Sequence, residues 1–375
     1  MVKGFHLTLM IGPAVPMPVS QDVIDALTSV RVTTNSESGS GFQLEFTLSN
    51  RSPLQTLFLL SGGAPIPLMR VVVIVTVGGR AEVLIDGVMT NHEIRPGADT
   101  AHSVLTVTGD DLSRVMDYID FSGFPFPAMP PEARVLLILG KYAFLGLIPM
   151  VIPSILIDLP IPTDRIPVQQ GKDLAYVRSL ADEVGYVFYV EPGPEPGMSV
   201  AYWGPQIKVG EPQKALSINM DFATNIESVA CTFQSQGRVM PIVFIQNQVT
   251  HAPIPIPIPD ITPLNPPLGV VPPIPLNFEP VKDSAKYSPI RAAVIGLTKA
   301  ARSADAVTAT GTLNVARYGA VLKARRLVGL RGVGEAFDGL YYVKSVTSRM
   351  KRGEFMQDFT LTRNGLLSTV PSVPA

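Results

Sequence analysis

The sequence predicts a mainly β protein with a smaller α+β module, and three observations support this fold class. Runs in which apolar and polar residues alternate recur before residue 110 and again after residue 216, and a period of two is typical of half-buried strands. Glycine-containing turns separate many of these runs. One stretch, residues 170–185, instead spaces its apolar residues three and four apart, as an amphipathic helix does.

Residues 1–110 are predicted to form an antiparallel sheet domain. The apolar run after Lys3 is expected to be the first strand and not a signal peptide, because the polar residues His6 and Thr8 interrupt it. Phe42, Leu44, Phe46 and Leu48 follow at a period of two and are expected to share one buried face of a hairpin.

Two further strands are predicted at residues 70–77 and 81–89, separated by the Gly78-Gly79 turn and with a bend at Asp86-Gly87. Another is predicted at residues 103–108. The domain is expected to curl into a barrel, because closure removes the free edges of a sheet.

Residues 111–215 are predicted to form the α+β module. The pair Asp110-Asp111 precedes apolar residues with helical spacing, so we expect a helix cap here rather than a pair of catalytic carboxylates. Residues 133–139 fit a strand and a helix equally well. Residues 170–185 contain the strongest predicted helix, and a hairpin with strands at residues 186–190 and 198–203 is expected after it.

Residues 216–366 are predicted to return to β structure. Strands are expected at residues 226–234 and 240–246, and a meander at residues 321–330, 339–350 and 354–363, with turns at Asp338-Gly339 and Arg352-Gly353. Residues 367–375 are expected to be a flexible tail.

A proline-rich insertion at residues 251–280 interrupts this part, with eleven prolines. Because proline lacks an amide donor, the insertion is expected to be an extended polyproline-like loop outside any strand ladder. Its few charges suggest that it lies against another surface. The candidate partner-contact residues are Pro253, Ile254, Pro255, Ile256, Pro257 and Ile258.

Composition argues against several classes of function. The formal net charge is -1, which gives no field to attract nucleic acid. Cys231 is the single cysteine and the four histidines have no metal-ligand spacing. No phosphate-binding loop and no nucleophile elbow occurs. We therefore expect no cofactor, no metal and no enzymatic activity, although distant carboxylates could still pair in a hydrolase.

Three stretches, in this order, resemble one known family: VLIDGVMTNHEI followed by SVLTVTGDDLSRVMD, then QQGKDLAYVRSLADEVGYVFYV, and finally RRLVGLRGVGEAFDGLYYVKSVTSRMKRGEFMQDFTLTRNG. Together they are similar to the phage late control D or tail hub family, which is related to the hub portion of type VI secretion spike proteins. The resemblance runs from about residue 16 to residue 365.

The resemblance implies two antiparallel β-barrel domains joined by small α+β domains, assembling as a trimeric ring. It implies a structural baseplate hub that adapts a central spike to a six-fold inner tube, with other baseplate components as further partners and no direct membrane insertion. Such a protein is made in the bacterial cytoplasm without a signal peptide. A cell-wall-degrading hydrolase and a host-surface binding module remain the alternatives.

Candidate interface or family-motif residues come from these matched stretches. They are Asp173, Leu174, Leu180, Gly185, Asp338, Gly339, Tyr341, Tyr342, Arg349, Lys351, Arg352 and Phe359. With Lys344, the three basic residues of this set make one hairpin strongly basic. The hairpin is expected to face an acidic partner or a channel lumen, or else to be an ordinary solvated turn.

Overall fold

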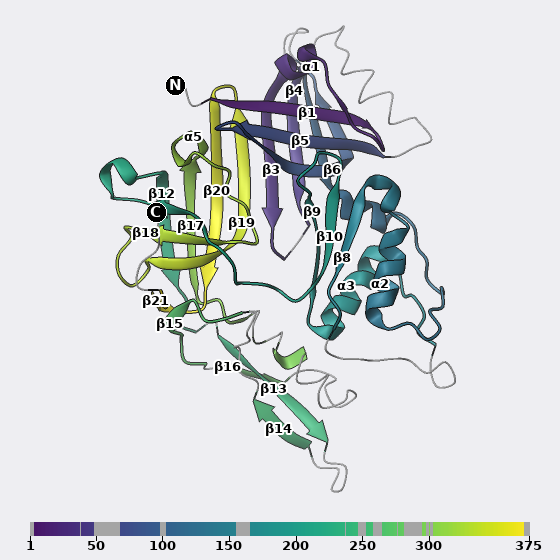
Figure 1. Cartoon of the computed structure of the whole chain (residues 1–375), viewed down its shortest axis with the longest axis vertical. Coiled ribbons are helices and arrows are strands. Elements are labelled where there is room, and N and C mark those ends of the chain that lie inside the picture. Colours follow the sequence, from purple (N-terminus) through teal and green to yellow (C-terminus); the bar gives the residue numbers. More distant parts are fainter. Residues whose placement is uncertain are drawn as a thin grey trace.

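The computed structural model describes residues 4–37, 39–48, 68–97, 103–154, 166–236, 238–246, 253–257, 265–275, 277–280, 295–297, 300 and 303–370. Within this part of the chain the protein is mainly β, as predicted, with one large, mainly antiparallel sheet and a smaller α+β module beside it (Figure 1).

The large sheet follows one path through eleven strands. In spatial order these are β12 (Ile226–Phe233), β17 (Val307–Asn314), β20 (Glu354–Arg363), β19 (Gly339–Lys351), β3 (Leu27–Asn35), β4 (Gly41–Leu48), β7 (Ser103–Asp111), β6 (Arg80–Arg95), β5 (Met69–Val77), β1 (Phe5–Pro13) and β2 (Met17–Pro18). A side branch adds β18 (Leu327–Arg331) to β19 and β11 (Gln213–Ser217) to β18. The short helices α1 (Gln21–Ala26) and α5 (Val315–Tyr318) flank the sheet.

One strand pair joins the N-terminal and C-terminal parts of the chain. β3 pairs with β19 from Asn35 opposite Ser345 to Ser29 opposite Lys351. A single apolar core therefore contains residues from both parts, from Leu9 to Leu361. The predicted hairpin face is confirmed, because Phe42, Leu44, Phe46 and Leu48 are all buried in this core.

The predicted bend at Asp86-Gly87 is wrong, because β6 continues through it to Arg95. Gly87 is needed for a close approach and not for a turn. A Cβ atom on Gly87 would lie 2.3 Å from the carbonyl oxygen of Asp110 on the paired strand β7, a separation that no side chain tolerates.

The α+β module has its own core. It comprises the 3-10 helices η3 (Leu112–Asp117) and η4 (Ala143–Leu145), the helices α2 (Pro131–Gly140) and α3 (Asp173–Val184), and a sheet of β8 (Leu147–Val151), β10 (Ser199–Gly204) and β9 (Val187–Pro192). Residues 133–139, left open by the sequence, are thus helical. The predicted helix is confirmed as α3, and it ends at Gly185 with a φ of 76°, a left-handed conformation that glycine adopts without strain.

The C-terminal meander is largely as predicted. The third predicted strand matches β20, and the second extends by one residue to give β19. The first prediction is wrong at its start, since β18 begins only at Leu327. Residues before it form a turn in which Arg325 has a φ of 63°.

The expectation that the proline-rich insertion forms no strand ladder is wrong. β14 (Pro253–Pro257) pairs with β13 (Val239–Gln246), which also pairs with β16 (Asn277–Pro280). β14 is the edge strand of this small sheet. The prolines occupy every second position of β14, so all their ring nitrogens can face away from β13. The residues between the prolines then supply the amide donors to β13. Ile258 lies outside the described residues.

A short two-stranded sheet lies near the C-terminus. β15 (Gly269–Val271) pairs with β21 (Leu366–Ser368), so the first two residues assigned to the flexible tail belong to a strand. Residues 371–375 lie outside the described part of the chain.

Candidate interaction surface

The side of the large sheet that faces away from the core is lined with small polar residues across eight strands. We call this surface the polar face. From β12 through to β6 it includes Ser228, Ala230, Thr232, Thr308, Thr310, Thr312, Asp358, Thr360, Ser345, Thr347, Arg349, Lys351, Ser29, Arg31, Thr33, Gln43, Glu45, Thr47, Thr106, Thr108, Asn91, Glu93 and Arg95. The apolar residues Met356 and Val104 lie on the same side.

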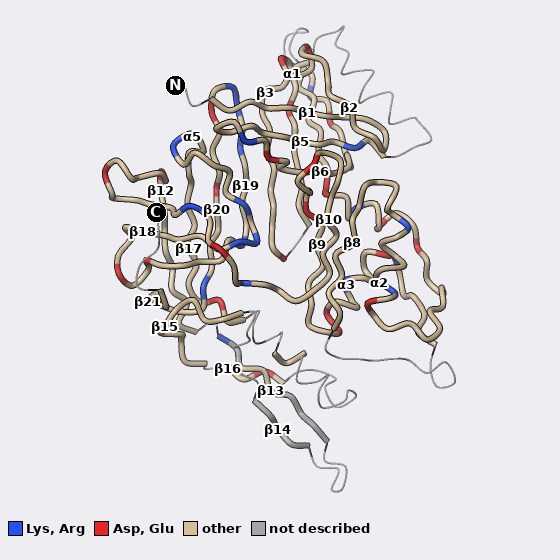
Figure 2. Tube along the Cα trace, in the orientation of Figure 1, with Lys and Arg blue, Asp and Glu red and all other residues tan. Residues whose placement is uncertain are grey.

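Contacts between neighbouring strands connect the polar face. The hydroxyl oxygens of Thr33 and Thr347 lie 3.1 Å apart across the β3–β19 pair that joins the two parts of the chain. The hydroxyl of Thr312 donates to Asp358 at 2.8 Å, and Arg349 pairs with the same carboxylate at 2.7 Å. Such pairs stabilise a sheet, and they neutralise charge locally. Figure 2 shows basic and acidic residues interspersed along the strands.

Both ends of the polar face are free strand edges among the described residues. In the part of the chain that the structure describes, β12 pairs only with β17. β6 changes partner along its length: its first part pairs with β5 and its second part with β7, so residues 91–95 have one side without a strand. An edge with unpaired amides and carbonyls is a template for another strand.

The core is also left open at the β12 edge. Val229, Cys231 and Phe233 point to the core side but are only partly buried, whereas Val307 and Ala309 on the next strand are fully buried. Burial raises the pKa of the Cys231 thiol. A further strand beside β12 would complete the burial of these side chains.

A buried ion pair fixes the α+β module to the sheet. Arg70 donates from Nε and Nη2 to the two oxygens of Asp86 at 2.7 and 2.6 Å, and both side chains are almost completely buried. Nη2 also donates to the carbonyl of Gly197 at 2.8 Å, and the Ser199 hydroxyl donates to Asp86 at 3.1 Å. The β9–β10 turn of the module is thereby tied to β5 and β6.

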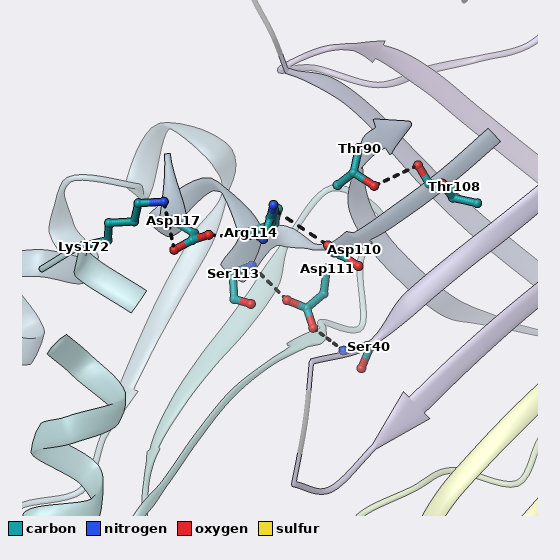
Figure 3. Close-up of polar contacts among 9 residues, drawn as sticks. All are labelled: Ser40, Thr90, Thr108, Asp110, Asp111, Ser113, Arg114, Asp117 and Lys172. Carbon is teal, nitrogen blue, oxygen red and sulfur yellow. Dashed lines mark hydrogen bonds and ion pairs between the residues drawn. The ribbon is translucent and has the colours of Figure 1, made fainter. Parts of the chain in front are cut away.

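A second link lies where β7 passes into η3 (Figure 3). The carboxylate of Asp111 accepts from the amides of Ser40 at 2.6 Å and Ser113 at 3.0 Å. This confirms the predicted cap, although the helix is a 3-10 helix. Burial raises the pKa of Asp111 against the effect of these hydrogen bonds. The carboxylate of Asp110 instead pairs with Arg114, with 3.8 Å between Oδ2 and Nε. The two acids therefore have separate structural contacts.

The candidate residues of the module stabilise it from within. Asp173 is buried and accepts from the Tyr142 hydroxyl at 2.8 Å and from Gln169 at 2.7 Å, and it pairs with Lys141 at 2.6 Å. Leu174 and Leu180 belong to the module's core and Gly185 ends α3. None of these four lies on the polar face.

The C-terminal candidates separate into two groups. Asp338 accepts from the backbone amides of Gly332, Val333 and Gly334 at 3.2, 2.8 and 3.2 Å and so fixes that loop. The other members of this internal group are Gly339, where a Cβ would meet Ser368, and the buried residues Tyr341, Tyr342 and Phe359.

The basic candidates are exposed. Arg349 and Lys351 lie on the polar face, Arg352 donates to the carbonyl of Asp25, and Lys344 pairs with Glu37 at 3.0 Å. Three of the four basic residues of the hairpin therefore have intramolecular partners.

Sequence inspection missed the polar face, although its signal is present. Threonine and serine alternate with apolar residues in VTATGTLN of β17 and in SVTSRMK of β19. That they form one surface with β3 and β4 depends on the β3–β19 register, which links residues more than 300 positions apart.

Metal and membrane features are not found in the described part of the chain. Its histidine, cysteine, aspartate and glutamate side chains form no group of three that could hold a metal ion. No helix there is long and apolar enough to cross a membrane.

Solved structures similar to this chain are phage tail proteins and secretion-system proteins. A tail protein from Neisseria meningitidis MC58 aligns over 97% of this chain and 98% of its own, with a TM-score of 0.61 and 13% identity. The 43 kDa tail protein of prophage MuSo2 from Shewanella oneidensis aligns over 96% and 98%, with a TM-score of 0.60 and 14% identity.

A third similar structure is an E. coli component of the type VI secretion system that is itself described as similar to tail proteins of bacteriophage T4. It aligns over 93% of this chain and 76% of its own, with a TM-score of 0.51 and 11% identity. No protein-family model and no curated protein sequence matches this chain. At these identities the comparisons establish the fold alone, and it is the mainly β fold of phage tail proteins that the sequence resemblance implied.

Proposed function

Because the chain has the fold of phage tail proteins along nearly its whole length, we propose that it is a structural subunit of a contractile phage tail or a related injection system. Within that particle we assign it to the baseplate hub, as a homotrimer that adapts the central spike to the six-fold inner tube. No catalytic role is part of this proposal.

The observation that carries the proposal is the polar face with its two free edges. Each part of the chain contributes four strands to it, β3, β4, β7 and β6 from one and β12, β17, β20 and β19 from the other. Three copies would therefore present six four-stranded faces, and a three-fold ring could match a six-fold one. Pairing of β12 with the free part of β6 on the next copy would close the ring and place the polar face around its lumen.

The interspersed charges of the polar face support a passage that does not bind nucleic acid, since binding requires an excess of positive charge. Arg349 and Lys351 would lie at this lumen. The proline-rich insertion, with β14, is proposed to contact a neighbouring subunit or another baseplate component. Deleting residues 253–275 and finding unchanged trimers and unchanged particle assembly would contradict that last assignment.

Two measurements test the ring. Light scattering of the purified protein should give about three times the chain mass of 40.3 kDa. Oxidation should then link Cys231 of one copy to a cysteine introduced at His92 or Ile94, since these residues lie on the core side of β6 as Cys231 does on β12. The control variant, Ile148→Cys, lies on β8 in the module and should give no link. A monomer at all concentrations would refute the hub, and a trimer without links would refute this strand pairing.

A further inference from the structure

The small sheet of β14, β13 and β16 projects from the body of the protein (Figure 1). In the described part of the chain, β14 and β16 are its two edge strands. An edge strand presents backbone donors and acceptors with which another strand can pair. Whether this sheet can accept a further strand therefore depends on which backbone groups its edges offer.

The prolines of β14 all face its outer edge. Within Pro253–Pro257 they alternate with Ile254 and Ile256. An antiparallel ladder uses the amides of every second residue, and proline has no amide donor. Only the two isoleucines can therefore donate to β13. Because neighbouring residues of a strand direct their N–H and C=O groups to opposite sides, the backbone groups of the three prolines point outward.

The outer edge of β14 consequently offers acceptors without donors. Its outward groups are the carbonyls of the three prolines, and a ring carbon takes the place of each amide hydrogen. A strand that approached this edge would find no donor for its own carbonyls. It would also meet the proline rings before reaching the spacing of about 4.8 Å at which strands pair.

A high proline content alone does not explain this placement. A proline in place of Ile254 or Ile256 would be equally compatible with a proline-rich segment, but it would remove a donor to β13. Without its prolines, the strand would be an uncharged run with high β propensity, a composition that promotes pairing between chains. The prolines occupy the positions that close the edge and preserve the sheet.

The other free edges of the described chain contrast with β14. β16 has only four residues and ends at Pro280, and short edge strands also resist pairing. The two edges of the polar face contain no proline: β12 reads IESVACTF, and residues 91–95 of β6 read NHEIR. The large sheet therefore has open edges, and the small sheet has closed ones.

We propose that the alternating prolines close β14 against strand addition, so that pairing of strands between copies is restricted to the edges of the polar face. The closure of β14 does not depend on the proposed trimer, because it follows from the backbone of this strand alone. A contact between the insertion and another subunit would then be made by side chains and not by an added strand.

Replacing Pro255 by threonine tests which way the prolines face. Threonine restores the amide and favours strands without adding a large apolar surface. At low concentration of the Pro255→Thr protein, hydrogen exchange at single-residue resolution should show the introduced amide exchanging at least about tenfold faster than the amides of Ile254 and Ile256. An introduced amide as protected as those of the isoleucines would mean that the prolines face β13, and would overturn the inference.

The triple variant Pro253→Thr, Pro255→Thr, Pro257→Thr tests the closure itself. With three donors restored, association beyond the wild-type oligomer should strengthen about tenfold or more, as measured by sedimentation velocity over a dilution series. The introduced amides should become protected as the protein associates. The matched control is Pro267→Thr, which changes an exposed proline of the same insertion outside any strand and should leave association unchanged.

The outcomes separate this inference from the hub. A triple variant that keeps the amides of Ile254 and Ile256 protected but associates no more than the wild type overturns the closure. If the triple variant loses the β13–β14 pair, the exchange of the introduced amide in Pro255→Thr decides. A monomeric wild type refutes the trimeric hub and leaves this inference intact, because the measured quantity is the association gained relative to the wild type.

Discussion

Replacing Arg70 by methionine should destabilise the protein far more than loss of a surface ion pair would. The substitution keeps a long side chain but removes the charge that faces Asp86 inside the sheet–module joint. Asp86 would then be a carboxylate with a side-chain exposure of 0%, whose remaining side-chain hydrogen bond comes from Ser199 at 3.1 Å. The carbonyl of Gly197 would also lose its donor.

The expected magnitude follows from leaving a buried charge without its partner. Breaking such a pair from one side costs about 3 to 5 kcal/mol of the free energy of unfolding. Removing both charges should cost much less, because a buried ion pair offsets only part of its own desolvation. Arg70→Met with Asp86→Leu is therefore expected to be more stable than Arg70→Met alone. This reversal distinguishes an unpaired charge from a simple loss of packing.

Urea unfolding followed by circular dichroism measures the change, and hydrogen exchange at β10 shows whether the module detaches first. The matched control is Arg317→Met, because Arg317 pairs with Glu227 at 3.1 Å with side chains 60% and 37% exposed. It should cost at most about 1 kcal/mol. The reasoning fails if Arg70→Met costs no more than Arg317→Met, or if adding Asp86→Leu lowers stability further.

Three further substitutions test single features of the fold, each by urea unfolding. Gly185→Ala should cost about 1 to 2 kcal/mol because of its φ of 76°, whereas Gly140→Ala, at the end of α2 with nothing within 4 Å of the added Cβ, should be neutral or stabilise by up to about 1 kcal/mol. Asp338→Ala should cost about 1 to 3 kcal/mol by leaving loop amides without an acceptor, and an equal loss for Asp338→Asn would contradict this. Because burial raises the pKa of Asp111 in the fold, the stability that it contributes is present below about pH 4 and is lost as pH rises through the raised value. The free energy of unfolding of the wild type, relative to that of Asp111→Asn, should therefore decrease from pH 4 to pH 7. An increase over this range would mean that the pKa of Asp111 is lowered and not raised in the fold.

The parts of the fold that follow from local signals were predictable. β20 has the predicted bounds because apolar residues recur at every second position over most of its length and a glycine turn precedes it. α3 was predictable from its apolar stripe and from Gly185, whose left-handed conformation ends the helix. In both cases the deciding interactions lie within a dozen residues, so the sequence contains them directly.

The failures concern features that depend on a partner strand. Proline density argued against a ladder for residues 253–257, and only the neighbouring β13 shows that an edge strand needs a donor at every second residue. The bend expected at Gly87 had the same origin, since the need for glycine there arises from the approach of β7. Neither partner can be read from the local pattern.

The candidate site was harder to predict than the fold because its residue types are common on strands, whereas their continuous arrangement over eight strands is unusual. Threonine and serine on the outer side of a strand are common, and every strand of the polar face resembles a solvated strand when taken alone. Continuity makes the surface distinctive: the Thr33–Thr347 contact joins two parts of the chain into one sheet, and among the described residues free edges end it on both sides. A monomer gains nothing from a long polar sheet with unsealed edges, which expose backbone donors and part of the core. In a closed ring the same features would become subunit interfaces and a continuous lining, so the proposed hub role follows from the topology of the sheet and not from any single residue.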